Sequence, residues 1–169
     1  MKIRLFLLLI GLFGISPILF SQTENLESVK PTGDSLCGTV NRQELQTGDF
    51  GKSFIEEYAN YKPNQGILNK LDKNLFSYTM TIVLGTWCHD SEQQVPRMFK
   101  ILDKMDFNTS KIQIICVDKK KTGCDTDISN MDIQRVPTFI LYKGEKEVGR
   151  IIETPKLSLE EDMLNILSN

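Results

Sequence analysis

The order of apolar and polar positions predicts strands alternating with helices. Mostly apolar runs at 76–84 and 112–117, with little polar alternation, have the length and the β-branched content of strands buried on both faces of a sheet. Between them, apolar residues recur every three or four positions from Glu92 to Met105, which predicts an amphipathic helix. Two parallel strands need a crossover of this kind, so we expect them to be neighbours in one sheet.

The C-terminal part of the chain predicts a hairpin and a last helix. Residues 138–142 and 147–152 have strand patterns on either side of a polar turn containing Gly144. Ser158 precedes Glu161 by three positions, which is the pattern of a capping box at a helix start.

The region before the first apolar run has a helical pattern. Apolar and aromatic residues from Phe50 to Tyr61 form one stripe, Pro63 ends it, and a second short helix ends near Asn74. No first strand is recognisable there. The sequence therefore predicts an α/β domain over residues 41–169, with a mixed central sheet, helices on both faces and a helical N-terminal extension.

Residues 1–21 have the pattern of a secretory signal peptide. Lys2 and Arg4 precede an apolar core at Leu5–Phe13, Pro17 follows, and the expected cleavage point is the bond between Ser21 and Gln22. A membrane anchor is the alternative, but the apolar stretch is short and contains Gly and Pro. We expect cleavage, export to a periplasmic or extracellular location, and no stable membrane insertion afterwards. Residues 22–40 are polar and are predicted to be a flexible lead-in.

The charge of the chain limits its partners. The net charge is −2, and removal of the two positive charges within residues 1–21 makes it −4. A mildly acidic domain argues against nucleic acid as a partner. We predict no cofactor and no metal ion. An exported chain would meet an oxidising compartment, in which disulfides persist.

The candidate chemistry centres on the stretch Thr86–Ser91, which joins the first apolar strand to the amphipathic helix. Cys88 lies there at a helix N-terminus, where free N–H groups and the helix dipole favour a thiolate. A protonated His89 beside it would stabilise that thiolate. On these residues alone, a buried structural cysteine is the alternative.

Three features together resemble the thioredoxin family. Trp87 and Cys88 occupy a strand-to-helix turn, Pro96 follows Cys88 by eight positions, and Pro137 precedes a second apolar strand. The resemblance covers roughly residues 77–167 and implies a thioredoxin-like fold. The chain departs from the family pattern at Ser91, where the second active-site cysteine would be.

The resemblance also implies how a substrate would bind. It implies that the Val136–Pro137 peptide bond is cis and faces Cys88, and that the backbone of Val136 pairs with an extended substrate beside Trp87. Ser91 would donate a hydrogen bond to the thiolate or cap the helix.

Two further cysteines leave alternatives open. Cys124 lies in a polar loop beyond the second apolar strand, at the sheet edge from which the Cys88 turn also departs. It would resolve a mixed disulfide in place of the missing cysteine, or form a structural disulfide with Cys37, or remain free.

The sequence thus predicts a monothiol thiol–disulfide oxidoreductase or isomerase acting through Cys88 on protein or peptide thiols and disulfides. A second thiol, from the substrate, from glutathione or from Cys124, would release the mixed disulfide. The alternative is a non-catalytic peptide-binding module that uses the groove around Trp87 and Pro137. The sequence names neither the substrate nor a redox partner.

Overall fold

A computed structural model of the 169-residue chain describes residues 35–71, 75 and 77–168. The predicted signal peptide and most of the predicted lead-in lie outside these residues. In chain order the elements are β1 (Gly38–Val40), η1 (Glu44–Gln46), α1 (Gly48–Asn60), α2 (Gln65–Leu68), β2 (Tyr78–Leu84), α3 (His89–Lys104), η3 (Thr109–Lys111), β3 (Ile112–Cys116), η4 (Ser129–Met131), β4 (Thr138–Lys143), β5 (Lys146–Ile152) and α4 (Leu159–Leu167). In this part of the chain, no helix has both the length and the apolar character needed to cross a membrane.

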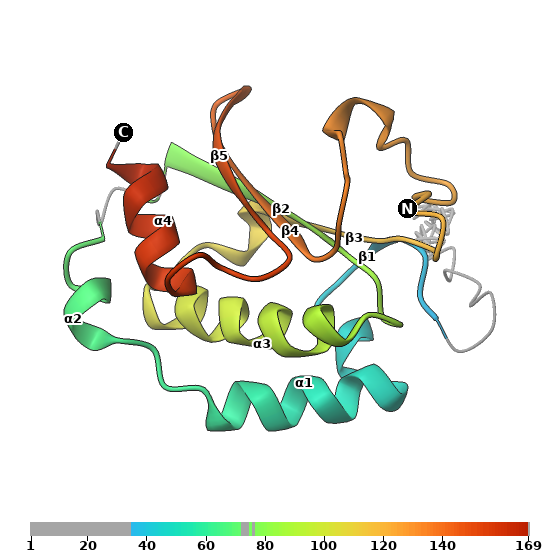
Figure 1. The fold of residues 1–169 in the computed structure, drawn as a ribbon, viewed down its shortest axis with the longest axis horizontal. Coiled ribbons are helices and arrows are strands. Elements are labelled where there is room, and N and C mark those ends of the chain that lie inside the picture. The colour runs from blue at the N-terminus through green and yellow to red at the C-terminus, as the bar shows by residue number, and fades with distance from the viewer. Residues whose placement is uncertain (1–34, 72–74, 76, 169) are drawn as a thin grey trace, which may run out of the picture.

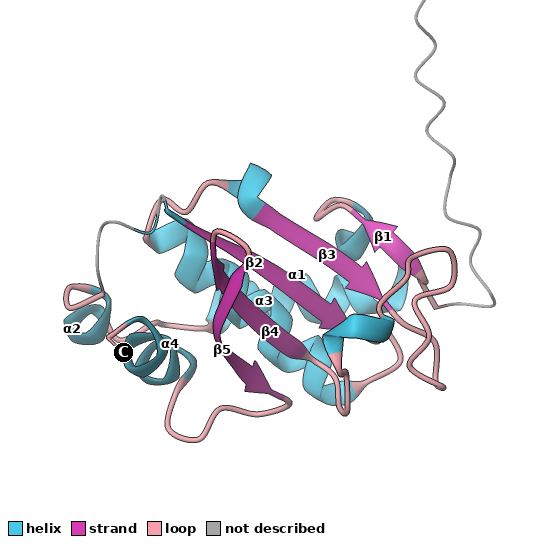
Figure 2. Cartoon of the chain, turned by 90° about the horizontal axis from the view of Figure 1, so that it is seen from above, coloured by secondary structure: helices cyan, strands magenta, loops and turns pink. Residues whose placement is uncertain are grey.

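The strands form one mixed sheet in the order β1-β3-β2-β4-β5 (Figure 2). β2 and β3 are parallel and are joined by the crossover helix α3, whereas the other three pairs are antiparallel. At the centre, Ile82 of β2 lies opposite Ile114 of β3 and Phe139 of β4. The predicted α/β fold class, with a mixed central sheet, is confirmed.

The two faces of the sheet are covered in different ways. The alternate residues Met80, Ile82 and Leu84 of β2 belong to a large core cluster to which all four α-helices contribute. On the other face, Val83 belongs to a smaller cluster completed by residues 117–136. Figure 1 shows this segment, in orange, on the side of the sheet away from α1 and α3. Helices were expected on both faces, but here a long loop with the short turn η4 takes the place of a helix.

The first strand lies where the sequence predicted a lead-in. β1 pairs with the C-terminal half of β3, with Gly38 opposite Cys116 and Val40 opposite Ile114. Gly38 has a φ of +94°, a conformation that glycine adopts readily. Three residues are too few to show an alternating pattern, so this strand depends on its pairing with β3 rather than on a local signal.

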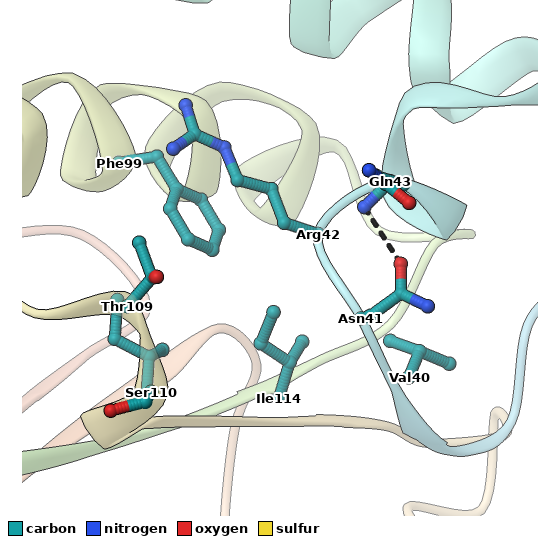
Figure 3. A pocket seen from close by; sticks show the side chains of 9 residues that line it. Val40, Asn41, Arg42, Gln43, Phe99, Thr109, Ser110 and Ile114 are labelled. Atoms are coloured by element: carbon teal, nitrogen blue, oxygen red, sulfur yellow. Dashed lines mark hydrogen bonds between the residues drawn. The ribbon is translucent and has the colours of Figure 1, made fainter.

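An arginine clamp holds α1 against α3. The Arg42 guanidinium donates to both carboxylate oxygens of Asp103 on α3, at 2.8 and 2.7 Å. It also lies 4.7 Å from the centre of the Phe99 ring and 5.3 Å from that of Tyr58 on α1. Figure 3 shows Arg42 beside Phe99 at the border of a hollow of about 570 Å³, which also has Ile114 of β3 in its wall.

The last helix begins as predicted. The Ser158 hydroxyl oxygen accepts the N–H of Glu161 at 3.2 Å, which caps α4. Glu160 is 1% exposed, and its carboxylate accepts the Tyr61 hydroxyl at 2.9 Å and the Asn64 N–H at 2.8 Å. Burial, together with this carboxylate, raises the pKa of Tyr61. α4 is thereby fastened to the connection between α1 and α2.

Candidate active site

The turn between β2 and α3 is closed by hydrogen bonds around Gly85. Its carbonyl accepts the Cys88 N–H at 2.9 Å, and its own N–H donates to the Ser91 hydroxyl oxygen at 3.3 Å. A Cβ atom at this position would lie 2.6 Å from the nearest atom of the Trp87 ring, closer than real contacts allow. Only glycine therefore permits the tryptophan to fold back over the turn.

Trp87 is fixed between the turn and the next strand. Its indole N–H donates to the carbonyl of Val117 at 2.9 Å, and its ring packs against the small cluster that contains Val83 and Val136. The ring remains partly exposed. The indole ring of Trp87, with its N–H already hydrogen-bonded, thus offers a flat apolar surface beside Cys88.

The thiol of Cys88 lies against the second segment of the predicted site. Cys88 is the N-cap residue of the 16-residue helix α3, and its side chain is partly exposed. The thiol donates to the carbonyl of Val136 at 3.3 Å across 48 positions of sequence. The Val136–Pro137 peptide bond is cis, as predicted. The turn and the proline segment therefore meet at the C-terminal end of β2 and the N-terminal end of β4.

The two residues predicted to assist Cys88 have other partners in the structure. The His89 side chain is 88% exposed, and its Nδ1 lies 3.5 Å from a carboxylate oxygen of Glu92. Ser91 is fully buried in the first turn of α3, and its hydroxyl oxygen accepts the N–H of Gly85. The Ser91 hydroxyl thus holds the turn in place through its hydrogen bond with Gly85. The sequence analysis missed Gly85, although a glycine shortly before a tryptophan on a tight turn is a recognisable signal.

The remaining cysteines separate into a bonded pair and a buried thiol. Cys37 and Cys124 form a disulfide with their Cα atoms 5.9 Å apart, so neither is a free resolving thiol in this structure. Burial, with a smaller effect of the Glu44 charge, raises the pKa of the Cys116 thiol to about 12. Cys88 is the accessible free thiol among the described residues.

A hollow of about 360 Å³ lies between the disulfide and the tryptophan. Its wall is made by Ser35, Leu36, Cys37, Trp87, Asp118, Lys119, Lys120 and Cys124. In the part of the chain that the structure describes, no three His, Cys, Asp or Glu side chains are gathered as they would be around a metal ion. The chemistry that this arrangement offers is that of a thiol at a helix N-terminus beside an exposed backbone segment.

Comparisons with known proteins give a likeness of fold. No family model matches the chain, and no curated protein matches it either. A protein of unknown function from Pseudomonas aeruginosa, in a 1.5 Å crystal structure, aligns with a TM-score of 0.52 at 12% identity, over 77% of this chain and 90% of that one. At this identity the likeness concerns the fold alone.

Two further solved structures align less closely. Oxidised thioredoxin O2 from Arabidopsis thaliana has a TM-score of 0.40 at 17% identity, over 61% of this chain and 85% of that one. An HIV epitope scaffold has a TM-score of 0.49 at 13% identity, over 76% of this chain and 96% of that one. With TM-scores this low, neither carries an argument about this chain.

Proposed function

We propose that this chain is an exported, monothiol thiol–disulfide oxidoreductase or isomerase whose nucleophile is Cys88. The observation that carries the proposal is the position of the Cys88 sulfur. It lies at the N-terminus of α3, partly exposed, and 3.3 Å from the carbonyl of Val136 before Pro137. A nucleophile and a backbone segment able to bind a substrate strand are thereby brought together.

The geometry supports the following exchange. The Cys88 thiolate attacks one sulfur of a substrate disulfide, a new S–S bond forms, and the other substrate sulfur leaves as a thiolate. The N–H groups in the first turn of α3 have no partner within the helix, so they favour the negative charge that Cys88 must carry to react. A second thiol then attacks the mixed disulfide and regenerates Cys88, which completes an exchange without net oxidation or reduction of the protein.

Substrate positioning is assigned to the neighbouring residues. An extended peptide would pair with the backbone of Val136 and lie across Pro137, with a side chain against the ring of Trp87. We propose protein or peptide thiols and disulfides as the substrates, and glutathione as an alternative resolving thiol. The basic and apolar pattern of residues 1–21 supports export to the periplasm or the cell exterior.

The proposal is tested by thiol labelling of the folded protein. Cys88 should react with iodoacetamide much faster than Cys116 in the folded protein, because Cys88 is partly exposed and Cys116 is buried. Buried Cys116 serves as the internal control, and Cys88→Ser should abolish the fast phase. If Cys88 reacts no faster than Cys116, or reacts only after denaturation, the catalytic proposal fails.

A peptide-binding module without turnover is the second candidate, and the burial of Ser91 favours it. No second thiol lies in the turn, because Ser91 occupies that position and is held by Gly85. Peptide capture by Cys88→Ser at undiminished affinity would support this candidate. Mixed disulfides that form with wild type and turn over on addition of a thiol would support the enzyme.

A further inference from the structure

The Cys37–Cys124 disulfide is asymmetric in its exposure. Cys37 is 5% exposed and precedes β1 directly, whereas Cys124 is exposed in the loop between β3 and β4. Cys124 is therefore the more open end of the disulfide, and a thiolate that attacks its sulfur would have the sulfur of buried Cys37 as the leaving group. Exposed disulfides are the ones that take part in exchange, while buried ones resist it.

The surroundings of the disulfide favour an incoming thiolate. Lys119 and Lys120 are exposed and belong to the wall of the same hollow of about 360 Å³. The carboxylate of Asp118, which also lies in this wall, accepts the N–H groups of Lys120 and Thr122 at 2.9 and 2.8 Å. The two lysine ammonium groups would attract an anionic thiol that enters the hollow. The Asp118 carboxylate would repel it less than a free carboxylate would, because it already accepts two hydrogen bonds.

The disulfide is also linked to the candidate active site on two sides. On one side, Trp87 forms part of the same hollow, and the N–H of Leu36 donates to the hydroxyl oxygen of Thr86 at 3.0 Å. On the other side, the loop that begins at Cys124 continues to Val136, whose carbonyl accepts the Cys88 thiol. One covalent bond therefore fastens the residue before β1 to the segment that forms half of the site.

We propose that the Cys37–Cys124 disulfide is a second thiol-exchange site, entered through Cys124 by an external thiol, and that its reduction opens access to Cys88. The thiolate attacks the Cys124 sulfur and releases Cys37 as a thiolate, which takes up a proton. A second external thiol then attacks the mixed disulfide and releases Cys124. The two external thiols are oxidised to one disulfide, and the protein gains two thiols.

Reduction would loosen the attachment of the loop to β1. After reduction, β1 and the loop would still be joined by side-chain hydrogen bonds of Thr126. Its hydroxyl contacts the N–H and the hydroxyl of Thr39, at 3.1 and 3.0 Å. The loop can then move away from Trp87, which exposes the ring and the neighbouring thiol. This regulation rests on the proposed function of Cys88, but the exchange at Cys124 does not.

The experiment uses the full chain and 2-mercaptoethanesulfonate as an anionic monothiol probe. After a short exposure and quenching with N-ethylmaleimide, mass mapping should find the probe on Cys124 and maleimide on Cys37. Full reduction should raise the alkylation rate of Cys88 at least threefold. The fluorescence of Trp87, the sole tryptophan of the chain, should change in parallel while the circular dichroism stays native.

Three variants make the outcome decisive. Lys119→Gln combined with Lys120→Gln should slow reduction by the probe severalfold, whereas Lys143→Gln with Lys146→Gln, at the opposite end of the sheet, should not. Cys88→Ser should leave the reduction rate unchanged, which separates this proposal from the function of Cys88. A probe found on Cys37, reduction only on unfolding, or unchanged labelling of Cys88 after reduction would overturn it.

Discussion

Replacing Gly85 by alanine tests how the turn places Trp87. The added Cβ would lie 2.6 to 2.9 Å from three atoms of the indole ring, so the ring must move. Overpacking of this kind costs about 1–3 kcal/mol. A displaced ring also loses the hydrogen bond to Val117, which contributes about 0.5–1.5 kcal/mol. Alanine recovers about 0.4–1 kcal/mol by restricting the unfolded chain, so we expect Gly85→Ala to destabilise the protein by about 1–3 kcal/mol.

The measurement is a double-mutant cycle with Trp87→Ala, in which the unfolding free energy of each variant is obtained from urea unfolding monitored by far-UV circular dichroism. In the Trp87→Ala background, the new methyl group no longer meets the indole ring, so the cost of Gly85→Ala should fall close to zero. The fluorescence of Gly85→Ala alone should shift to the red, because the indole ring becomes more exposed.

A second glycine provides the control. Gly144 has a φ of +62°, and no atom lies within 4 Å of the position that an added Cβ would take, so Gly144→Ala costs only backbone strain, about 1–2 kcal/mol. That cost should be the same with and without Trp87. If Gly85→Ala is equally destabilising in both backgrounds, the steric reasoning about the turn is refuted.

Three further predictions concern the site and its support. Ser91→Cys should allow a disulfide with Cys88 and raise insulin-reductase activity well above that of wild type; no gain in a folded variant would exclude thioredoxin-like geometry at the turn. Glu160→Ala should cost about 1–3 kcal/mol in urea unfolding because it removes the acceptor of two partly buried hydrogen bonds, those of the Tyr61 hydroxyl and the Asn64 N–H, while Tyr61→Phe should cost about 1 kcal/mol. Burial raises the pKa of Asp103, but its hydrogen bonds with Arg42 and Tyr58 outweigh this and lower the pKa, so the Asp103 carboxylate stabilises the fold above the unfolded pKa of about 3.9 and loses this contribution at lower pH. The difference in unfolding free energy between wild type and Asp103→Asn should therefore narrow as the pH falls from about 5 toward about 2. A difference that stays constant over this range would contradict the prediction.

The main elements and the central turn were predictable because their signals are local. Cys88 and Trp87 stand between an apolar run and an amphipathic one, and Pro137 precedes a strand pattern, so their places in the elements were predictable. That Pro137 would face Cys88 was implied by the resemblance to the thioredoxin family and not by these local patterns. The short strand β1 was not predictable, since Gly38–Val40 is defined by its pairing with β3.

The side-chain partners within the site depend on tertiary packing. Ser91 was expected to assist the thiolate or cap the helix, but the helix turns its hydroxyl toward the N–H of Gly85. His89 was expected beside Cys88, but its ring is directed to Glu92 on the next turn of α3. The choice among the pairings of Cys124 was equally open, because sequence spacing does not determine which cysteines are close in space.

The disulfide closes part of the polypeptide into a ring and leaves the residues after Cys124 as an open C-terminal arm. Residues 37–124 form the ring, so a protease that cuts one bond inside it leaves a single covalent molecule, whereas a cut beyond Cys124 detaches the arm. Cys88 belongs to the ring, while Val136 and Pro137 belong to the arm. One nick in the loop after Cys124 would therefore leave the reactive sulfur and its proposed substrate platform on separate chains, held together without a covalent bond by the pairing of β2 with β4, by the hydrogen bonds of Glu160 and by side-chain packing.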